Sequence, residues 1–163
     1  MERKIVGFKI REDDYAFEIM KVVEIIRLKE ITEVPTAPDF IEGVINLRGK
    51  IIPIIDLRRR FGMESKEATI MFRIVIVEYA KHQLVGVVVD EVTKVINAKE
   101  SDMLAAPATV TGAGGRYIQS IVKIEDKIIV LLDIEKIFTE DEQDKLKIIA
   151  LSEGGKFEES PNS

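Results

Sequence analysis

The sequence contains no cysteine, no tryptophan and a single histidine among its 163 residues. The lack of cysteine excludes disulfides, thiolate metal sites and a cysteine nucleophile. The one histidine, His82, lies between Lys81 and Gln83 at a predicted hairpin turn. A zinc site would therefore need three carboxylates converging from elsewhere, and no spacing in the sequence indicates them. We expect no metal, no cofactor and no catalytic residue in this chain.

Long apolar segments and a basic surface are missing as well. No apolar run approaches the roughly 18 residues of a membrane-spanning helix, and residues 1–11 lack the apolar core and cleavage site of a signal peptide. The formal net charge is −5, and residues 139–163, with seven acidic and three basic side chains, carry most of it. The nearly neutral remainder does not resemble a nucleic-acid-binding surface. We expect a cytoplasmic protein that neither binds nucleic acid nor inserts into a membrane.

Isoleucine and valine are abundant, and their β-branched side chains favour strands. Alternating apolar residues separated by short polar turns predict four hairpins, with limbs at 5–10 and 15–19, 44–47 and 50–56, 74–77 and 84–89, and 117–124 and 127–133. The limb at 50–56 is apolar on both sides and belongs in a core, so Pro53 within it must face an edge or a bulge. The expected fold is mainly β.

The segments between the hairpins have weaker patterns. Spacing over 20–26 is helical or mixed, 90–96 resembles a connector, 111–115 a flexible loop, and short helical turns are predicted at 39–42, 57–61 and 99–106. Thr139 and Glu142 have the spacing of a capping box before a final helix whose apolar stripe is Leu146, Ile149 and Ala150. We expect one domain over residues 1–150 and a disordered tail over 151–163.

An internal repeat is the most informative feature of the sequence. Lys50-Ile51-Ile52, Asp56 and Phe61 recur 77 residues later as Lys127-Ile128-Ile129, Asp133 and Phe138. Residues 17–26 match residues 87–96 at an offset of 70. The repeat implies two related modules of roughly 60 to 70 residues. A module of this size buries too little apolar surface to form a stable core alone. We expect the two modules to pack face to face.

Several short motifs have both a chemical and a structural interpretation. Carboxylates that could supply an acid and a base occur at Asp13-Asp14, Asp56, Asp90-Glu91 and Asp133. The recurrence of Asp56 at Asp133, each time after a strand and before a helical turn, favours helix capping. The TGAGG segment at 111–115 lacks the Lys-Ser or Lys-Thr of a phosphate loop. The PTAP segment at 35–38 has the spacing of an SH3 ligand, but a rigid turn explains it more simply.

The segment PDFIEGVINLRGKIIPIIDLRRRFG, residues 38–62, resembles the signature of the CheW family of chemotaxis coupling proteins. Its features are a proline and an aromatic residue, then Gly-Val, Asn-Leu-Arg-Gly, and an apolar strand ending in Pro-x-x-Asp-Leu. The segments FEIMKVVEIIR, VGVVVDEVTKVI and VLLDIEKIF match in the same order, so the resemblance covers roughly residues 3–150.

The resemblance implies two SH3-like five-stranded β-barrels packed side by side, with short helices and a C-terminal helix. We expect a single CheW-like domain of two intertwined subdomains, approximately residues 17–72 and 84–138, each completed by exchanged terminal strands or helices. The resemblance also implies an adaptor without enzyme activity. Its partners would be the regulatory domain of the chemotaxis histidine kinase and the cytoplasmic tip of chemoreceptors, in a ternary complex or array.

Carried over by motif, the receptor-binding residues would be Val22, Glu24, Gly43, Asn46, Arg48 and Gly86. Arg48 at a hairpin tip could hydrogen-bond a carboxylate on a helix surface, and Val22 would add apolar contact. The glycines could instead serve a positive φ or a close approach of two segments. No motif marks the kinase-binding surface, so its residues stay unassigned.

Two other functions are open at this point. The chain could be a regulatory CheW-like domain detached from a histidine kinase or a response-regulator fusion, although Met1 close to the first strand and the polar tail favour a stand-alone adaptor. It could also be a small-molecule or oligonucleotide-binding β-barrel. With a nearly neutral body, three tyrosines and no tryptophan, such a barrel would lack a stacking platform.

Overall fold

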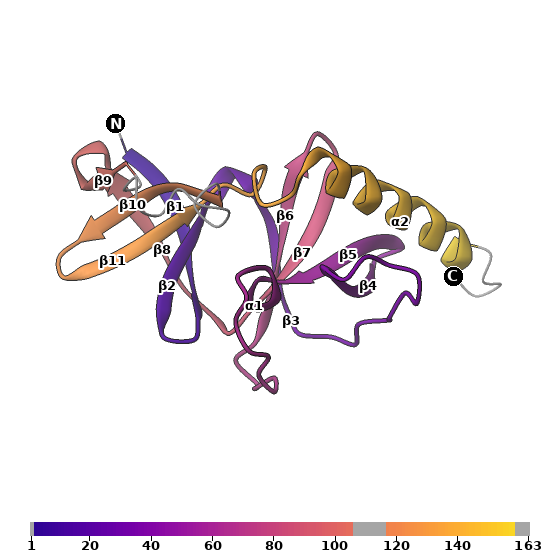
Figure 1. Cartoon of the computed structure of the whole chain (residues 1–163). Coiled ribbons are helices and arrows are strands. Elements are labelled where there is room, and N and C mark those ends of the chain that lie inside the picture. The colour runs from indigo at the N-terminus through magenta and orange to yellow at the C-terminus, as the bar shows by residue number, and fades with distance from the viewer. Residues whose placement is uncertain (1, 106–116, 159–163) are drawn as a thin grey trace.

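The computed structural model describes residues 2–105 and 117–158, and its strands form two sheets that lie side by side (Figure 1). One sheet has the strand order β3-β6-β7-β5-β4, and we call it the central subdomain. The other has the order β8-β1-β2-β11-β10-β9, and we call it the terminal subdomain. The prediction of a mainly β fold with two subdomains and a C-terminal helix is confirmed.

All four predicted hairpins are present, each with a two-residue turn. The central strands are β3 (Val22–Arg27), β4 (Ile41–Leu47), β5 (Lys50–Asp56), β6 (Arg73–Ala80) and β7 (Gln83–Val89). The terminal strands are β1 (Glu2–Ile10), β2 (Asp13–Glu18), β8 (Glu91–Lys99), β9 (Met103–Leu104), β10 (Ile118–Ile124) and β11 (Lys127–Leu132). The helical elements are η1 (Ile19–Lys21), α1 (Leu57–Arg60), η2 (Glu100–Asp102) and α2 (Glu140–Glu158).

The sequence repeat corresponds to an exchange of strands between the subdomains. The β1–β2 hairpin lies in the terminal subdomain, but the next strand, β3, pairs with β6 in the central one. Conversely, the β6–β7 hairpin is central, and the next strand, β8, pairs with β1. The β4–β5 and β10–β11 hairpins also correspond, because β5 pairs in parallel with β7 and β11 pairs in parallel with β2. The chain therefore crosses between subdomains at two equivalent positions.

This exchange moves the subdomain boundaries. The central sheet is built from residues 22–89, and the terminal sheet combines residues 2–18 with strands between 91 and 132. Strand β7 thus lies in the first module, whereas the predicted boundary at residue 84 assigned it to the second. Helix α2 continues to Glu158, eight residues past the predicted end of the domain at 150.

Both exchanged strands were wrongly predicted. Residues 20–26, expected to be helical or mixed, form η1 and β3, and the expected connector at 90–96 is largely β8. Each is the outer strand of its sheet, and each pairs with its neighbour through a register shift, which interrupts the apolar alternation that marks a strand. Instead of the helical turn at 39–42 there is a turn followed by β4. The expected helix at 99–106 is η2 and β9 up to residue 104, and the loop at 111–115 lies outside the described residues.

Pro53 lies in an interior strand, since β5 is flanked by β4 and β7. The prediction was an edge or a bulge, and only the edge alternative is wrong for the strand as a whole. The parallel pairing with β7 begins at Ile54, one residue later, and the β4–β5 ladder has a register shift opposite Ile54 and Ile55. Proline is accommodated where the β7 ladder has not yet started.

Within the described residues, buried apolar side chains form three clusters, and the largest of these lies between the subdomains. This inter-subdomain core takes Phe8 and Phe17 from the terminal sheet and Val75 and Val87 from the central one. Smaller clusters lie within the central subdomain, around Ile74 and Ile76, and within the terminal one, around Ile5 and Leu131. The two modules therefore share their main core, as their small size requires.

Helix α2 packs against the central subdomain, where Leu146 and Ile149 are buried. The predicted capping box is present: Thr139 Oγ1 accepts from the Glu142 backbone N at 3.1 Å, and Glu142 Oε1 accepts from the Thr139 backbone N at 2.9 Å.

We expect Thr139→Ala to lower the free energy of unfolding by about 1 kcal/mol, because the Glu142 backbone N–H in the first turn of α2 loses its acceptor. Urea unfolding checks this, with the exposed loop variant Thr36→Ala as a control that should stay at the wild-type value.

Candidate partner-binding site

The tip of the β4–β5 hairpin carries two of the predicted site residues, Asn46 and Arg48. Arg48 and Gly49 form the turn with φ of 52° and 86°, as a two-residue hairpin turn with positive φ at both positions requires. Asn46 Oδ1 accepts a hydrogen bond from the Gly49 backbone N at 2.8 Å, and the Asn46 backbone oxygen accepts one from Lys29 Nζ at 2.6 Å. Asn46 therefore shapes the turn that presents Arg48.

Arg48 is held over β3 by Glu24. Its Nη2 and Nη1 atoms donate to Glu24 Oε1 and Oε2 at 2.5 and 3.2 Å, a bidentate pair between two predicted site residues. The hydrogen bonds from Arg48 lower the pKa of the Glu24 carboxyl below its ordinary value, so this carboxylate stays charged at neutral pH. Because 71% of the Arg48 side chain is exposed, its remaining donors are free to meet a partner.

A groove of about 240 Å³ lies beside this ion pair. Glu24, Arg48 and Lys50 supply its charged groups, and its apolar lining is Val23, Leu47, Ile52, Ile76 and Leu84. Ile52 and Ile76 belong to the core of the central subdomain, so the groove reaches the edge of that core. An apolar floor with charges at the rim suits the surface of an amphipathic helix.

Val22, predicted to supply the apolar contact, lies elsewhere. It is half-buried against the inter-subdomain core, whereas Val23 is 55% exposed and lines the groove. Val22 and Val23 are consecutive in β3, so their side chains point to opposite faces of the strand. The motif named Val22 for the apolar contact, and Val23 was missed because the sequence does not show which face of the strand meets the groove.

Gly43 and Gly86 lie behind the surface. Both are buried, and a Cβ on Gly43 would lie 2.3 Å from the Thr32 backbone oxygen. A Cβ on Gly86 would lie 2.5 Å from Ile54 Cδ1 and 2.8 Å from Ile74 Cγ2. The structural interpretation of these glycines, a close approach of neighbouring segments, is the one that the geometry supports.

A second surface lies at one end of the central subdomain, where Ile70 and Met71 are 89% and 50% exposed. With Leu28 and Phe72 they line a hollow of about 510 Å³ whose charged side chains are Arg27 and Arg73. Adjacent exposed apolar side chains of this size mark interaction surfaces. Neither residue belongs to a motif, and exposure cannot be seen in the sequence.

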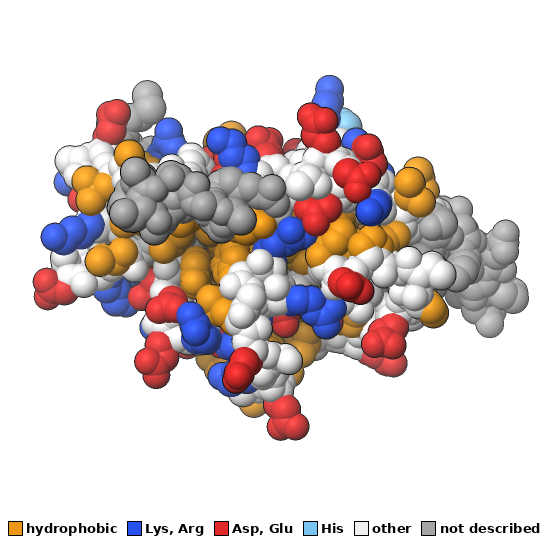
Figure 2. Space-filling model, viewed as in Figure 1, with side chains coloured by type: hydrophobic (Ala, Val, Ile, Leu, Met, Phe, Trp, Pro, Cys, Tyr) orange, Lys and Arg blue, Asp and Glu red, His pale blue; other side chains and the backbone are white. Residues whose placement is uncertain are grey.

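A third hollow opens between the subdomains, where hydrophobic side chains gather in the middle of the face drawn in Figure 2. Its volume is about 500 Å³, and it is lined in part by Tyr15, Phe61 and Tyr117. Their rings stack in sequence, with centroids 5.7 and 6.0 Å apart. This hollow is the exposed margin of the core that joins the two subdomains.

Five of the six carboxylates considered for acid–base chemistry have structural partners, including Asp14, which pairs with Lys9 at 3.6 Å. Asp56 Oδ1 accepts from the Arg58 backbone N at 2.9 Å at the start of α1, so the capping interpretation is confirmed for Asp56. Asp133 Oδ1 makes the equivalent hydrogen bond with the Glu135 backbone N at 3.0 Å, but at a turn and not at a helix. Asp13 pairs with Arg11, and Asp90 pairs with Arg58. Over residues 2–105 and 117–158, no group of three or more histidine or acidic side chains could hold a metal ion, and no helix is long and apolar enough to span a membrane.

Two small β subdomains that share a core and expose grooves have the architecture of a binding module. The model of the CheW-like domain matches residues 4–142, and the chain belongs to this family. Chemotaxis protein CheW of Treponema pallidum is 35% identical over 151 residues, covering 88% of this chain and 86% of that protein. Chemotaxis protein CheW of Bacillus subtilis is 34% identical over 139 residues, covering 85% and 89%.

A solved structure shows the same architecture. The crystal structure of the scaffolding protein TtCheW from Thermoanaerobacter tengcongensis superposes with a TM-score of 0.78 at 40% identity, covering 85% of this chain and 93% of that one. The family that the Asn-Leu-Arg-Gly segment indicated is therefore confirmed, together with the two SH3-like subdomains that it implied.

Proposed function

We propose that this chain is a chemotaxis adaptor that couples chemoreceptors to the chemotaxis histidine kinase. Its relatives are chemotaxis CheW proteins, and the similar solved structure is of a scaffolding protein. The chain covers 86% and 89% of the length of these two CheW proteins, which supports the coupling adaptor. In this role the adaptor acts at receptor arrays on the cytoplasmic side of the membrane and performs no catalysis.

The receptor-binding surface that we propose is the groove beside the Glu24–Arg48 pair. The observation that carries the proposal is the combination of an apolar floor, including Val23, with an exposed guanidinium held by two hydrogen bonds. The cytoplasmic tip of a chemoreceptor is a helical hairpin, whose surface offers apolar side chains next to carboxylates. Asn46 supports this surface through the turn, and Gly43 and Gly86 support it through packing.

Co-sedimentation tests the adaptor function directly. Receptor cytoplasmic fragments in vesicles are mixed with the kinase, with and without the chain. Kinase should pellet with the vesicles only when the chain is present, because an adaptor bridges two proteins by holding each at its own surface. Equal pelleting of kinase without the chain would contradict the proposal.

The surface around Ile70 and Met71 is the one that we propose for the kinase regulatory domain. It lies in the central subdomain but is lined by other residues than the Glu24–Arg48 groove, so the two proposed contacts share no lining residue. We expect Ile70→Glu to weaken kinase binding at least about tenfold, because a charge replaces an apolar contact in the middle of the interface. Calorimetry at tens of micromolar protein measures the affinity.

Ile148→Glu is the matched control for this prediction. Ile148 is also a highly exposed isoleucine, 63% accessible, but it lies on α2 away from the proposed surfaces. It should leave kinase affinity unchanged, and both variants should still co-sediment with receptor vesicles. Equal affinities of Ile70→Glu and wild type would remove this surface from the kinase contact.

We also propose that the adaptor joins rings or arrays with the kinase. The terminal subdomain exposes apolar residues of its own, with Leu104 and Ile128 at 53% and 60% accessibility. Contacts from both subdomains to related barrels would be head-to-tail, and such contacts close into rings when the rotation between subunits permits.

A further inference from the structure

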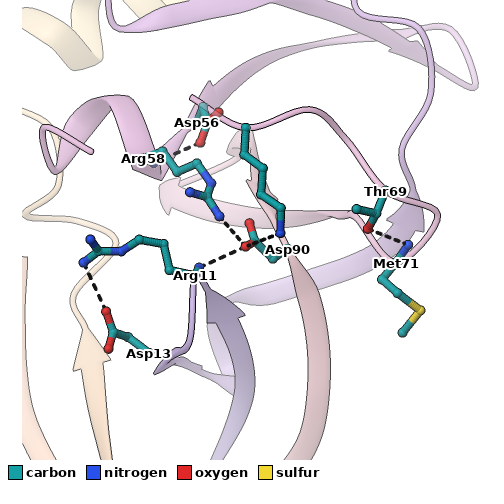
Figure 3. Close-up of polar contacts among 8 residues, drawn as sticks. Arg11, Asp13, Asp56, Arg58, Thr69, Met71 and Asp90 are labelled. Carbon is teal, nitrogen blue, oxygen red and sulfur yellow. Dashed lines mark hydrogen bonds and ion pairs between the residues drawn. The ribbon is translucent and has the colours of Figure 1, made fainter. Parts of the chain in front are cut away.

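Asp90 occupies the point where the chain leaves β7 of the central subdomain and enters β8 of the terminal one. It is 9% exposed, which is rare for an aspartate outside an ion pair or a hydrogen-bond network. Figure 3 shows its carboxylate between Arg58, on α1, and the backbone of Arg11, in the β1–β2 turn. Neither docking surface described above includes Asp90.

One carboxylate oxygen connects both subdomains. Asp90 Oδ2 accepts a hydrogen bond from the Arg11 backbone N at 2.9 Å, from the terminal side. It also accepts one from Nη2 of Arg58, from the central side, in a short ion pair. Lys66 Nζ lies 3.9 Å from the same oxygen, and the Asp90 backbone N donates to the Lys9 backbone oxygen at 2.9 Å. The contact therefore ties three chain segments together at the crossing.

Both side chains of the Arg58–Asp90 ion pair are buried, so the pair is stable only if its hydrogen-bonding geometry is kept. The side chains of Arg58 and Asp90 are 7% and 11% exposed, and Arg58 Nε is buried without a hydrogen-bond partner in the described part of the chain. A buried ion pair adds little net stability, but removing one partner leaves a charge that has to reach water. At this place, the path to water runs along the junction of the two subdomains.

The equivalent crossing in the other half of the repeat is built differently. At offsets of 70 and 77, the positions of Asp90 and Arg58 correspond to Met20 and Glu135. Met20 is 91% exposed, and Glu135 instead pairs with Lys21 at 2.9 Å, both side chains being at least a third exposed. Exposed pairs of this kind contribute little and are screened by salt. The buried contact at Asp90 is thus specific to one crossing.

We propose that Asp90 is a positioning residue that sets the angle between the two subdomains, and thereby whether assemblies of this adaptor close. The proposal deepens the adaptor function given above. Head-to-tail contacts made by two subdomains close into a ring only at one rotation per subunit, and otherwise continue as open chains. A small change of angle at the crossing would leave each binary contact intact and still prevent closure.

The angle is measured without any partner. The chain has no cysteine, so Lys81→Cys in the β6–β7 turn and Lys123→Cys on β10 provide one spin-label site in each subdomain. In this background we expect Asp90→Asn to broaden and shift the inter-label distance distribution from pulsed electron paramagnetic resonance. Arg58→Lys, which keeps the charge but loses the guanidinium fork, should give a smaller shift in the same direction. Lys21→Gln, at the other crossing, should reproduce the parent distribution.

Assembly is the second readout. For Asp90→Asn, binary affinities for receptor fragment and kinase regulatory domain should stay within about threefold of wild type, because Asp90 lines neither proposed surface. Closed rings with the kinase regulatory domain, counted by electron microscopy, should be lost in favour of open chains. A purely structural role would instead lower binding and ring formation in parallel.

Two results would overturn the proposal: inter-label distributions of Asp90→Asn and Arg58→Lys that match the parent, or normal rings despite a broadened distribution. If Asp90→Asn does not fold, Arg58→Lys decides both readouts. Failure of the wild type to bind either partner would refute the adaptor function, whereas the distance measurement would still test the role of Asp90.

Discussion

Replacing Arg48 by glutamate is expected to weaken receptor coupling at least about tenfold, because the reversal removes the exposed donors of the groove and places two carboxylates side by side. Co-sedimentation of the variant with receptor fragments and kinase measures the loss. Binding of the kinase regulatory domain alone should be unchanged, since Arg48 does not line the Ile70 surface.

The fold should survive this change. Arg48 has a φ of 52°, and the equivalent turn of the second repeat holds Glu125 at a φ of 56°. The fold thus accepts a glutamate at this turn position, and the Arg48 side chain is mostly exposed. The circular-dichroism spectrum and melting temperature should match those of the wild type, and a collapsed spectrum would make the role of Arg48 structural.

A charge swap separates two roles of Arg48. In the double variant Glu24→Arg/Arg48→Glu the ion pair forms again with its partners exchanged. If the pair only braces the groove, coupling returns. If Arg48 itself contacts the receptor, as we propose, coupling stays lost. Arg3→Glu is the matched control, because Arg3 forms a similarly exposed pair with Glu18, at 2.9 Å, in the terminal subdomain.

Replacing Gly43 by alanine is expected to cost about 2–4 kcal/mol of unfolding free energy, because the new Cβ would overlap the backbone of Thr32. Thr32 and Val44 exchange two backbone hydrogen bonds of 2.9 Å, an isolated bridge that ties the segment after β3 to β4. Neither backbone can move without losing this bridge. Urea unfolding gives the difference.

Alanine at two other glycines should cost less unfolding free energy than alanine at Gly43. In Gly86→Ala the clash is with side-chain methyl groups of Ile54 and Ile74 and not with backbone, so we expect about 1–2 kcal/mol. In Gly49→Ala the Cβ meets nothing within 4 Å, and only the positive φ opposes it, at about 1 kcal/mol. For Gly43→Ala and Gly86→Ala, receptor coupling should fall only as far as the folded fraction of the variant falls. A stable Gly43→Ala variant that has lost receptor coupling would assign Gly43 to the contact itself.

The sequence by itself determined the features that rest on local chemistry. Period-two apolar segments and short polar turns identified all four hairpins, and the spacing of Thr139 and Glu142 identified the start of α2. The repeat identified two modules with a shared core, and the Asn-Leu-Arg-Gly segment identified the family. The motif assigned Glu24 and Arg48 to one receptor-binding site, and the two side chains are in contact in the structure.

Only the tertiary structure decided which strand completes which subdomain. β3 and β8 each follow a hairpin of one sheet and pair with the other, and strand exchange leaves no mark on local periodicity. The face that β3 turns toward the groove then decided that Val23, and not Val22, lines it. The partnership of Asp90 with Arg58 and Arg11 joins residues 32 and 79 positions apart, and such burial results from long-range packing, which no local pattern encodes.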